Sequence, residues 1–439
     1  MPVASESREL LDNRPSCLSS PISAVDFAML RTDSIVITGM GALTCAGPSV
    51  EDLWQAALAS AVQVNRGPLG LEHTTCGIAQ IPQTADTQRL TRKGDRFLPL
   101  ALHAANAAWQ DAGLTKVDMV PERCGLIAGT SRGPINRVVA LAETHRHRRP
   151  RLSSALHSIH SCLSGTLAIH FHIRGPAITL SAACTSGAVA LGMAAEQLLL
   201  GKADFMLAGA AEAPLTAFVL HQMAAAGFLG HHDEHPERAC RPFDSTRNGT
   251  VVGEGAGFMV LERASSALAR GANIHATLSG WSFASEAEHR ATPNPQGEGL
   301  QHVTREALLR AGLAASDIAW INAHGTGTHA NDLAETQALK GLGMDGIPCS
   351  STKPVTGHCL GATAALEAIL AVQAVKTGQL PPTATLRDPD PACALTLVQG
   401  GPRYSKCDHA LSLSQAFWGK TAALVLSKHD PNTIARIHS

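Results

Sequence analysis

The chain has 439 residues, of which 45% are hydrophobic and only 4% aromatic, and its formal net charge at pH 7 is -1. This charge balance excludes a protein that attracts nucleic acid or a membrane surface through a global field. No apolar run of about 18 residues or more is present, so no membrane insertion is predicted. The 11 cysteines are scattered without a CxxC pair, which favours reduced thiols in a cytoplasmic protein over a disulfide framework.

Residues 1–33 are polar and lack both the basic and the apolar segment of a secretory signal, so they predict a flexible N-terminal extension. From residue 34 onward, strand-like and helix-like segments alternate, which is typical of an α/β protein. The predicted strands cover residues 34–38, 124–128, 177–181, 205–209, 257–261, 318–322, 411–413 and 422–426. Helical periodicity is found at 49–61, 101–112, 188–200, 299–311 and 362–376.

Cys184 is the leading candidate for a reactive atom. It lies in the run Ser-Ala-Ala-Cys-Thr-Ser-Gly at residues 181–187, between a predicted strand and a predicted helix. A thiol at that turn meets unpaired helix N–H groups and the positive end of the helix dipole, which are expected to lower its pKa and favour the thiolate. A small buried core cysteine is the alternative.

Two histidines occupy the same kind of position further along the chain. His324 follows a predicted strand in the Gly-rich run Ala-His-Gly-Thr-Gly-Thr, and His358 ends the run Lys-Pro-Val-Thr-Gly-His before a predicted helix. In open α/β sheets such loops gather at one edge, so we expect Cys184, His324 and His358 to meet there. The tract His-His-Asp-Glu-His at residues 231–235 has consecutive rather than face-spaced donors in a loop, so we expect no metal site there.

These motifs resemble the β-ketoacyl-acyl-carrier-protein synthases (ketosynthases) of the thiolase-like superfamily. Five blocks match in order, at residues 37–41, 181–187, 241–257, 323–328 and 353–358. The resemblance implies a duplicated, five-layered α-β-α-β-α fold. Residues 34–262 would form an N-terminal half that carries the nucleophile, and residues 263–439 a C-terminal half that carries both histidines.

The family's reaction explains these residue types. An acyl group would move from acyl carrier protein onto Cys184, and the backbone N–H groups of Cys184 and Phe417 would bind the tetrahedral oxyanion. Malonyl carrier protein would then lose CO2. His324 and His358 would donate N–H groups to the enolate, which attacks the acyl-cysteine to give a 3-oxoacyl product. The resemblance also implies an acyltransferase that uses no cofactor.

Lys353 and Glu335 resemble the family's lysine and its acidic partner. An unshifted amine stays protonated at neutral pH, so Lys353 is interpreted as a fixed cation that orients the loop rather than as a base. Asp332 also fits an ordinary helix N-cap, with Glu335 completing a capping-box-like start.

The chain departs from the family near its C-terminus, where Gln-Ala-Phe-Trp-Gly-Lys-Thr at residues 415–421 replaces a flexible Gly-rich loop. Phe417, the gate-like residue, is retained. A non-Gly residue at positive φ is costly, so we expect the local backbone or its gating motion to differ. Asn248 replaces a more common Asp, which is reminiscent of type II polyketide or polyene ketosynthase subunits.

The expected partner is an acidic acyl carrier protein bearing phosphopantetheine-linked acyl and malonyl groups. Arg92, Lys93 and Arg96 lie in the segment that the family uses for docking, although a solvated basic loop is an equal alternative. The resemblance further implies a homodimer, or a heterodimer with a sister subunit. Two alternative functions remain: a chain-length-factor-like partner subunit, which would be expected to lack the nucleophile, and a thiolase or simple acyltransferase.

Overall fold

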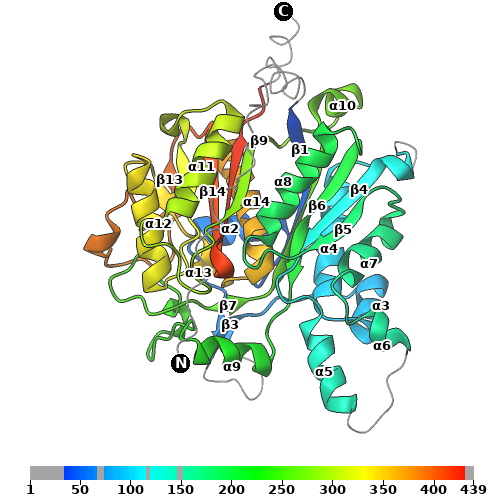
Figure 1. Ribbon diagram of the computed structural model, residues 1–439, viewed down its shortest axis with the longest axis horizontal. Helices are drawn as coiled ribbons and strands as arrows, with labels where there is room; N and C mark the ends of the chain where they lie inside the picture. The colour runs from blue at the N-terminus through cyan, green and yellow to red at the C-terminus, as the bar shows by residue number, and fades with distance from the viewer. Residues whose placement is uncertain (1–33, 67–73, 115–118, 146–151, 431–439) are drawn as a thin grey trace, which may run out of the picture.

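The computed structural model describes residues 34–66, 74–114, 119–145 and 152–430 (Figure 1). The predicted extension at residues 1–33 lies outside these ranges. The strands are β1 (Ile35–Leu43), β2 (Asn65–Arg66), β3 (Thr75–Gly77), β4 (Cys124–Gly129), β5 (Ala177–Leu180), β6 (Phe205–Glu212), β7 (Val252–Gly253), β8 (Gly255–Arg263), β9 (Ala276–Ser285), β10 (Trp320–Asn322), β11 (Cys349–Ser350), β12 (Gln379–Leu380), β13 (Arg403–Tyr404), β14 (His409–Ala416) and β15 (Lys420–Ser427).

The helices alternate with these strands, as the sequence pattern predicts. They are α2 (Val50–Leu58), α3 (Ala85–Lys93), α4 (Phe97–Asp111), α5 (Ile135–His145), α6 (Leu152–Leu156), α7 (Cys162–Phe171), α8 (Ser186–Leu199), α9 (Ala217–Ala225), α10 (Ala264–Ala269), α11 (Glu298–Ala311), α12 (His329–Gly341), α13 (Lys353–Thr356) and α14 (Thr363–Thr377). Short 3₁₀ turns include η4 (Leu360–Ala362) and η6 (Phe417–Gly419).

Ten strands form one sheet whose two ends repeat the same topology. The order is β11-β10-β14-β15-β9-β1-β8-β6-β4-β5. In the N-terminal half β4 pairs in parallel with β5 and β6, and β8 runs antiparallel between β6 and β1. In the C-terminal half β10 pairs in parallel with β11 and β14, and β15 runs antiparallel between β14 and β9. The halves join where β1 pairs antiparallel with β9. The predicted boundary between residues 262 and 263 falls at the end of β8.

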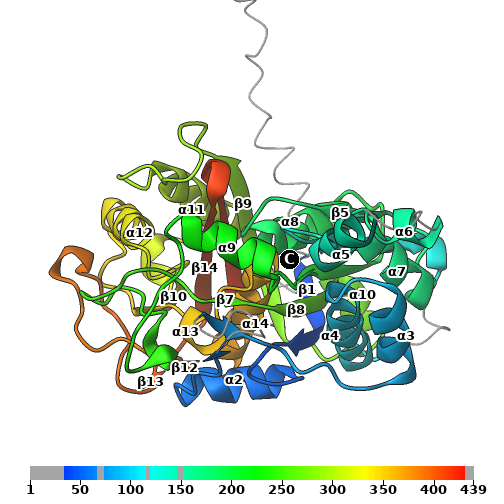
Figure 2. The same cartoon turned by 90° about the horizontal axis from the view of Figure 1, so that it is seen from below.

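The helices complete five layers, which confirms the predicted fold class. Helices α8 and α14 contact each other and pack between the two halves of the sheet. Helices α4 and α7 cover the outer face of the N-terminal half, and α11 and α12 lie on the outer side of the C-terminal half (Figures 1 and 2). Gly187 permits the central contact, because a Cβ there would lie 2.5 Å from the backbone nitrogen of Ala365.

The segment Leu360–Thr377 is long and apolar enough to span a membrane by composition, and 89% of it is buried inside the protein. Its burial between the two halves of the sheet identifies it as the central helix of the core. All thirteen residues from Thr363 to Val375 in α14 are buried. The helix therefore supplies core packing, and its N-terminal end is fixed next to the loop that carries His358.

Candidate active site

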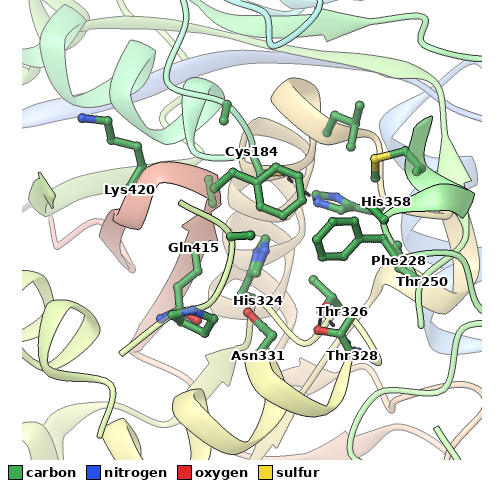
Figure 3. A pocket seen from close by; sticks show the side chains of 18 of the residues that line it. Cys184, Phe228, Thr250, His324, Thr326, Thr328, Asn331, His358, Gln415 and Lys420 are labelled. Atoms are coloured by element: carbon green, nitrogen blue, oxygen red, sulfur yellow. Dashed lines mark hydrogen bonds between the residues drawn. The ribbon is translucent and has the colours of Figure 1, made fainter. Parts of the chain in front are cut away.

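Cys184 lies in the sharp turn between β5 and α8. The preceding residue, Ala183, has φ 50°, in the left-handed region that costs energy for a residue with a Cβ. This strained turn places Cys184 just before the N-terminal end of α8, where the side chain is 8% exposed. Figure 3 shows Cys184 facing a cavity that it shares with His324 and His358.

His358 contacts the nucleophile directly. Its Nε2 lies 3.2 Å from the Sγ of Cys184, and its Nδ1 lies 2.9 Å from the Oγ1 of Thr363. His358 precedes α14 and follows β11, so it holds the position in the C-terminal half that Cys184 holds after β5 in the N-terminal half. The repeated topology therefore brings two equivalent loops face to face.

His324 completes the group from the loop after β10. Its ring centroid lies 5.4 Å from that of His358, with the rings nearly perpendicular. Glu335 of α12 holds this loop, because its carboxylate accepts the backbone N–H groups of His324 (2.6 Å) and Gly325 (2.8 Å). Lys353 donates to the carbonyl oxygen of His324 from the other side. The backbone of His324 is thus clamped at both ends.

Lys353 pairs with a different acid from the predicted one. Its Nζ donates to the Oε1 of Glu367 at 2.7 Å, and both side chains are almost fully buried. Glu335 instead uses its two oxygens on backbone N–H groups. Glu367 comes from α14, so the packing of the central helix against the His324 loop decides the partner. The prediction of a Lys353–Glu335 pair was wrong in this respect.

Asp332 is not the N-cap of its helix. Thr328 is the N-cap of α12, and Asp332 is buried inside the first turn. Its carboxylate accepts the backbone N–H groups of Phe243 (2.9 Å), Thr326 (3.1 Å) and Gly327 (3.2 Å). Asp332 therefore joins the Gly-rich turn after His324 to the loop that contains Phe243. This role is structural, but it is not the predicted capping box.

Electrostatics of the site differ from the predicted thiolate. Burial raises the pKa of the Cys184 thiol to about 12, whereas Lys353 and Arg132 act to lower it. Burial, reinforced by Lys353, lowers the pKa of both His324 and His358 well below the usual value. Both imidazoles are therefore neutral at pH 7. Cys184 is therefore a thiol beside a neutral base, because desolvation outweighs the end of the helix dipole.

The surrounding cavity has a volume of about 800 Å³ and reaches the altered C-terminal loop. Phe417 lines it, and its ring packs against Phe228 with centroids 4.6 Å apart. Trp418 adopts φ 65° and ψ 26°, so this non-Gly residue does occupy the left-handed region that the sequence indicated as costly. Its backbone N–H donates to the carbonyl of Arg290, which ties η6 to the loop after β9.

Neither Arg92 nor Arg96 is among the described residues that line the cavity. Arg92 is exposed on α3, and the side chain of Lys93 lies outside the described part of the structure. Arg96 forms an ion pair with the buried Glu254, with Nη2 and Oε1 2.5 Å apart. Its guanidinium also donates to the carbonyl of Ala79. Arg96 therefore has an internal structural role that the sequence did not indicate.

Sequence reasoning missed Glu212, a fully buried carboxylate at the end of β6. It accepts backbone N–H groups from Arg132 (3.0 Å) and Gly361 (3.2 Å), and so joins the loop after β4 to the turn after His358. Burial raises the pKa of Glu212 to about 7. The residue lies in an apolar strand with no motif around it, and only the position of the two loops in space reveals its role.

Comparison with known proteins identifies the family. Family models for the N-terminal and C-terminal domains of beta-ketoacyl synthase match residues 32–267 and 275–387. The 3-oxoacyl-[acyl-carrier-protein] synthase 2 of Coxiella burnetii is 34% identical over 408 residues, which are 90% of this chain and 98% of that protein. Its counterpart from Synechocystis is 34% identical over 418 residues, covering 92% and 100% of the two chains.

Solved structures agree with this assignment. A beta-ketoacyl synthase from Burkholderia phymatum superposes with a TM-score of 0.84 at 31% identity, and the ishigamide ketosynthase/chain length factor with 0.84 at 30%. A type II PKS ketosynthase, solved bound to its acyl-carrier protein and a hexaketide, gives 0.83 at 28%. All three alignments cover 91% of this chain and 100% of the matched one. By its sequence, its duplicated five-layered fold and its grouped cysteine and histidines, the chain belongs to the β-ketoacyl synthase family.

Proposed function

We propose that this protein is an acyltransferase that condenses an acyl group held on Cys184 with malonyl-acyl carrier protein, and that it releases CO2 and a 3-oxoacyl-acyl carrier protein. The observation that carries the proposal is the 3.2 Å separation of Cys184 Sγ from His358 Nε2, with the ring of His324 in the same cavity. Fatty-acid and polyketide synthesis both use this reaction.

Acylation begins with loss of the Cys184 proton. Because burial disfavours the free thiolate, the neutral His358 Nε2 is the base within reach. The thiolate attacks the carbonyl carbon of the acyl thioester, and the oxyanion forms beside the backbone N–H groups of Cys184 and Phe417. When the tetrahedral intermediate collapses, the carrier thiolate leaves with the proton returned by His358.

Condensation uses the two neutral imidazoles as donors. Cleavage of the C–C bond between the malonyl α-carbon and its carboxylate releases CO2 and leaves the electron pair as a thioester enolate. N–H groups of His324 and His358 directed at the enolate oxygen stabilise it, and removing one such donor typically costs about 100-fold or more in rate. In this step His358 takes the Nε2–H tautomer, with Nδ1 accepting from the hydroxyl of Thr363. The enolate carbon attacks the acyl-cysteine, the C–S bond breaks, and Cys184 leaves as a thiolate that takes up one proton from solvent to regenerate the thiol.

The test separates acylation from condensation. Purified protein is incubated with acyl-loaded carrier protein and its intact mass is measured, before and after malonyl carrier protein is added. Cys184→Ala is expected to form no adduct. His324→Ala is expected to form the adduct but to turn it over about 100-fold more slowly. An acyl adduct that persists on Cys184→Ala would refute the assignment of the nucleophile.

The partner proteins belong to the same proposal. The neighbours include a ketosynthase bound to its acyl-carrier protein and ketosynthases paired with chain length factors. For this chain we infer docking of an acidic carrier protein at the surface that includes Arg92. We also infer a cytoplasmic homodimer or heterodimer that forms along strand β5, because β5 ends the ten-stranded sheet and leaves the Ile178 side chain 42% exposed.

The alternatives are less well supported by the site. A chain-length factor has no use for a cysteine and two histidines arranged around one cavity. A thiolase needs a second cysteine in the cavity, and Cys359, although adjacent to His358, is fully buried and absent from the described lining. Decarboxylation without acylation in the mass assay would favour the partner-subunit role over the condensing enzyme.

A further inference from the structure

The cavity around Cys184 carries an excess of positive charge. Among the residues described along its lining there is no Asp or Glu, whereas the cations Arg132 and Lys420 are both present. Other partly or fully buried arginines of the fold, such as Arg96, Arg247 and Arg270, are paired with carboxylates. Arg132 and Lys420 are only half-buried, but a plain hydrocarbon chain in the cavity would cover such a cation without giving it a partner, which is unfavourable.

Arg132 stands beside the nucleophile. Strands β4 and β5 are parallel neighbours, with Gly129 opposite Leu180, and the loops that carry Arg132 and Cys184 leave their ends side by side. The Thr130 N–H donates to the Leu180 carbonyl at 3.1 Å across this pair of loops. Glu212 fixes the Arg132 backbone by accepting its N–H at 3.0 Å.

The guanidinium itself is uncommitted. In the described part of the chain no residue accepts a hydrogen bond from it or forms an ion pair with it. Its charge is one of those that lower the pKa of Cys184, whereas Lys353 is the cation that acts on His324 and His358. The charge of Arg132 therefore acts on the nucleophile, and both residues come from loops of the N-terminal half. The histidines that would activate the malonyl group come from the C-terminal half, on the loops after β10 and β11.

We propose that the acyl chain accepted by Cys184 is oxygenated, with a carbonyl or carboxylate oxygen that Arg132 binds, rather than a saturated hydrocarbon. This inference rests on the proposed condensing function and names its acyl substrate class. A guanidinium donates up to five N–H bonds and suits carboxylate or carbonyl oxygens. An apolar chain in the same place would cover the cation without pairing it, which disfavours loading.

The test uses three acyl groups of nearly equal shape on the same carrier protein. Glutaryl ends in a carboxylate, 5-oxohexanoyl in a ketone and 5-methylhexanoyl in an isopropyl group. Initial rates of adduct formation on Cys184 are measured by intact mass. We expect both oxygenated groups to load faster than the apolar one. Arg132→Leu should reduce the ratio of oxygenated to apolar loading about ten- to hundredfold, the usual range for loss of a hydrogen bond to a charged group.

Two further variants separate recognition from general electrostatics. Arg132→Lys keeps the charge and should retain most of the preference for oxygenated chains. Lys420→Leu removes the other cation of the cavity and should leave the ratio of oxygenated to apolar loading rates unchanged. An effect of Arg132 on the Cys184 thiol alone would change all three rates together, so only a change in their ratio supports direct binding.

The outcomes distinguish the two proposals. If 5-methylhexanoyl loads on the unaltered protein as fast as the oxygenated groups, the inference about Arg132 is wrong while the condensing function stands. That comparison needs no variant, so poor folding of Arg132→Leu does not prevent a decision. If none of the three groups forms an adduct on Cys184, both the substrate class and the proposed function are wrong.

Discussion

Lys353 keeps a positive charge inside the protein, and Glu367 makes this tolerable. The ammonium donates to Glu367 and to the His324 carbonyl, with the Lys353 side chain only 1% exposed. Breaking a buried pair by removing one partner leaves an uncompensated charge. The pair therefore both stabilises the fold and fixes the loop that carries His324.

We predict that Glu367→Leu lowers the free energy of unfolding by about 3 kcal/mol or more, the usual cost of breaking a buried ion pair. The double variant Lys353→Met, Glu367→Leu should recover much of that loss, because no unpaired charge remains. Urea unfolding of the two single variants and the double variant measures the coupling. Strictly additive losses would contradict a direct interaction between the two side chains.

Glu212 should make stability depend on pH. Its folded pKa is about 7, above the value near 4.3 of an unfolded chain, so the folded state holds the proton more tightly. Stability from this group is therefore complete below about pH 4 and is lost as the pH rises toward 7.

Glu212→Gln, which keeps an acceptor oxygen, should flatten this decline by up to about 3 kcal/mol across that interval. Unfolding measured in urea at several pH values between 4.5 and 7.5 checks the slope. Equal slopes for the variant and the unaltered protein would place the proton uptake on other groups, of which Glu335 and Glu367, also with a pKa of about 7, are the nearest candidates.

Sequence motifs identified Cys184, His324 and His358, because each stands in a short run at a strand-to-helix turn. The residues that hold them were harder to find. The partner of Lys353 lies 14 positions away on a helix that is apolar almost throughout, and Arg132 lies in a loop without a motif. Their roles depend on which loops meet in space. The prediction of a Cys184 thiolate was wrong for a related reason: the sequence does not show how deeply the thiol is buried, and burial raises its pKa.

At the scale of elements, η6 stands where the resemblance implied a flexible Gly-rich loop. Trp418 adopts the left-handed conformation and is 64% exposed as a residue, so the strained backbone gains little from side-chain burial. Hydrogen bonds from the Trp418 N–H to Arg290 and from the Glu286 N–H to Gly419 hold this conformation in place. The turn is therefore fixed by its neighbours rather than by its own residue preference.

We predict that Trp418→Gly raises the free energy of unfolding by roughly 0.5–1 kcal/mol, because glycine adopts positive φ without steric cost. Trp418→Ala is the matched control, since it removes the indole but keeps the Cβ, and it should bring no such gain. Thermal unfolding of both variants gives the comparison. A gain with alanine equal to that with glycine would attribute the effect to the indole instead of the backbone.

Alternation of strands and helices predicted most of the fold. Each of the eight expected strands overlaps a strand of the large sheet, but β9 and β11 were missed. Strand β9 contains serine, threonine and glycine at partly exposed positions, and β11 has only two residues. Neither carries the apolar run that the other strands show. The two halves also repeat the same strand order, but no matching repeat is legible in the amino-acid sequence.

At the scale of the whole molecule, strand β5 forms one edge of the ten-stranded sheet. Strand β5 pairs only with β4, and its residues Ala177 and Ile178 are exposed. On the adjacent helix α7 the Ile169 side chain is 79% exposed. An uncovered edge strand with apolar side chains is a template for pairing with another chain. The same strand ends at the turn that carries Cys184, so the association would also brace the nucleophile.

Ile178→Lys is therefore predicted to weaken self-association, because pairing along β5 would bury an ammonium without a partner. The expected rise in the dissociation constant is about tenfold or more, since burying an unpaired polar group costs on the order of 1–3 kcal/mol. Leu268→Lys is the control, because Leu268 is similarly exposed, at 46% against 42%, but lies on α10 away from this edge.

Sedimentation velocity over a range of concentrations measures both variants. Equal association of Ile178→Lys and the unaltered protein would exclude β5 as the interface. If Ile178→Lys dissociates and also loads Cys184 more slowly, whereas Leu268→Lys does neither, then the edge strand couples assembly to the geometry of the nucleophile turn.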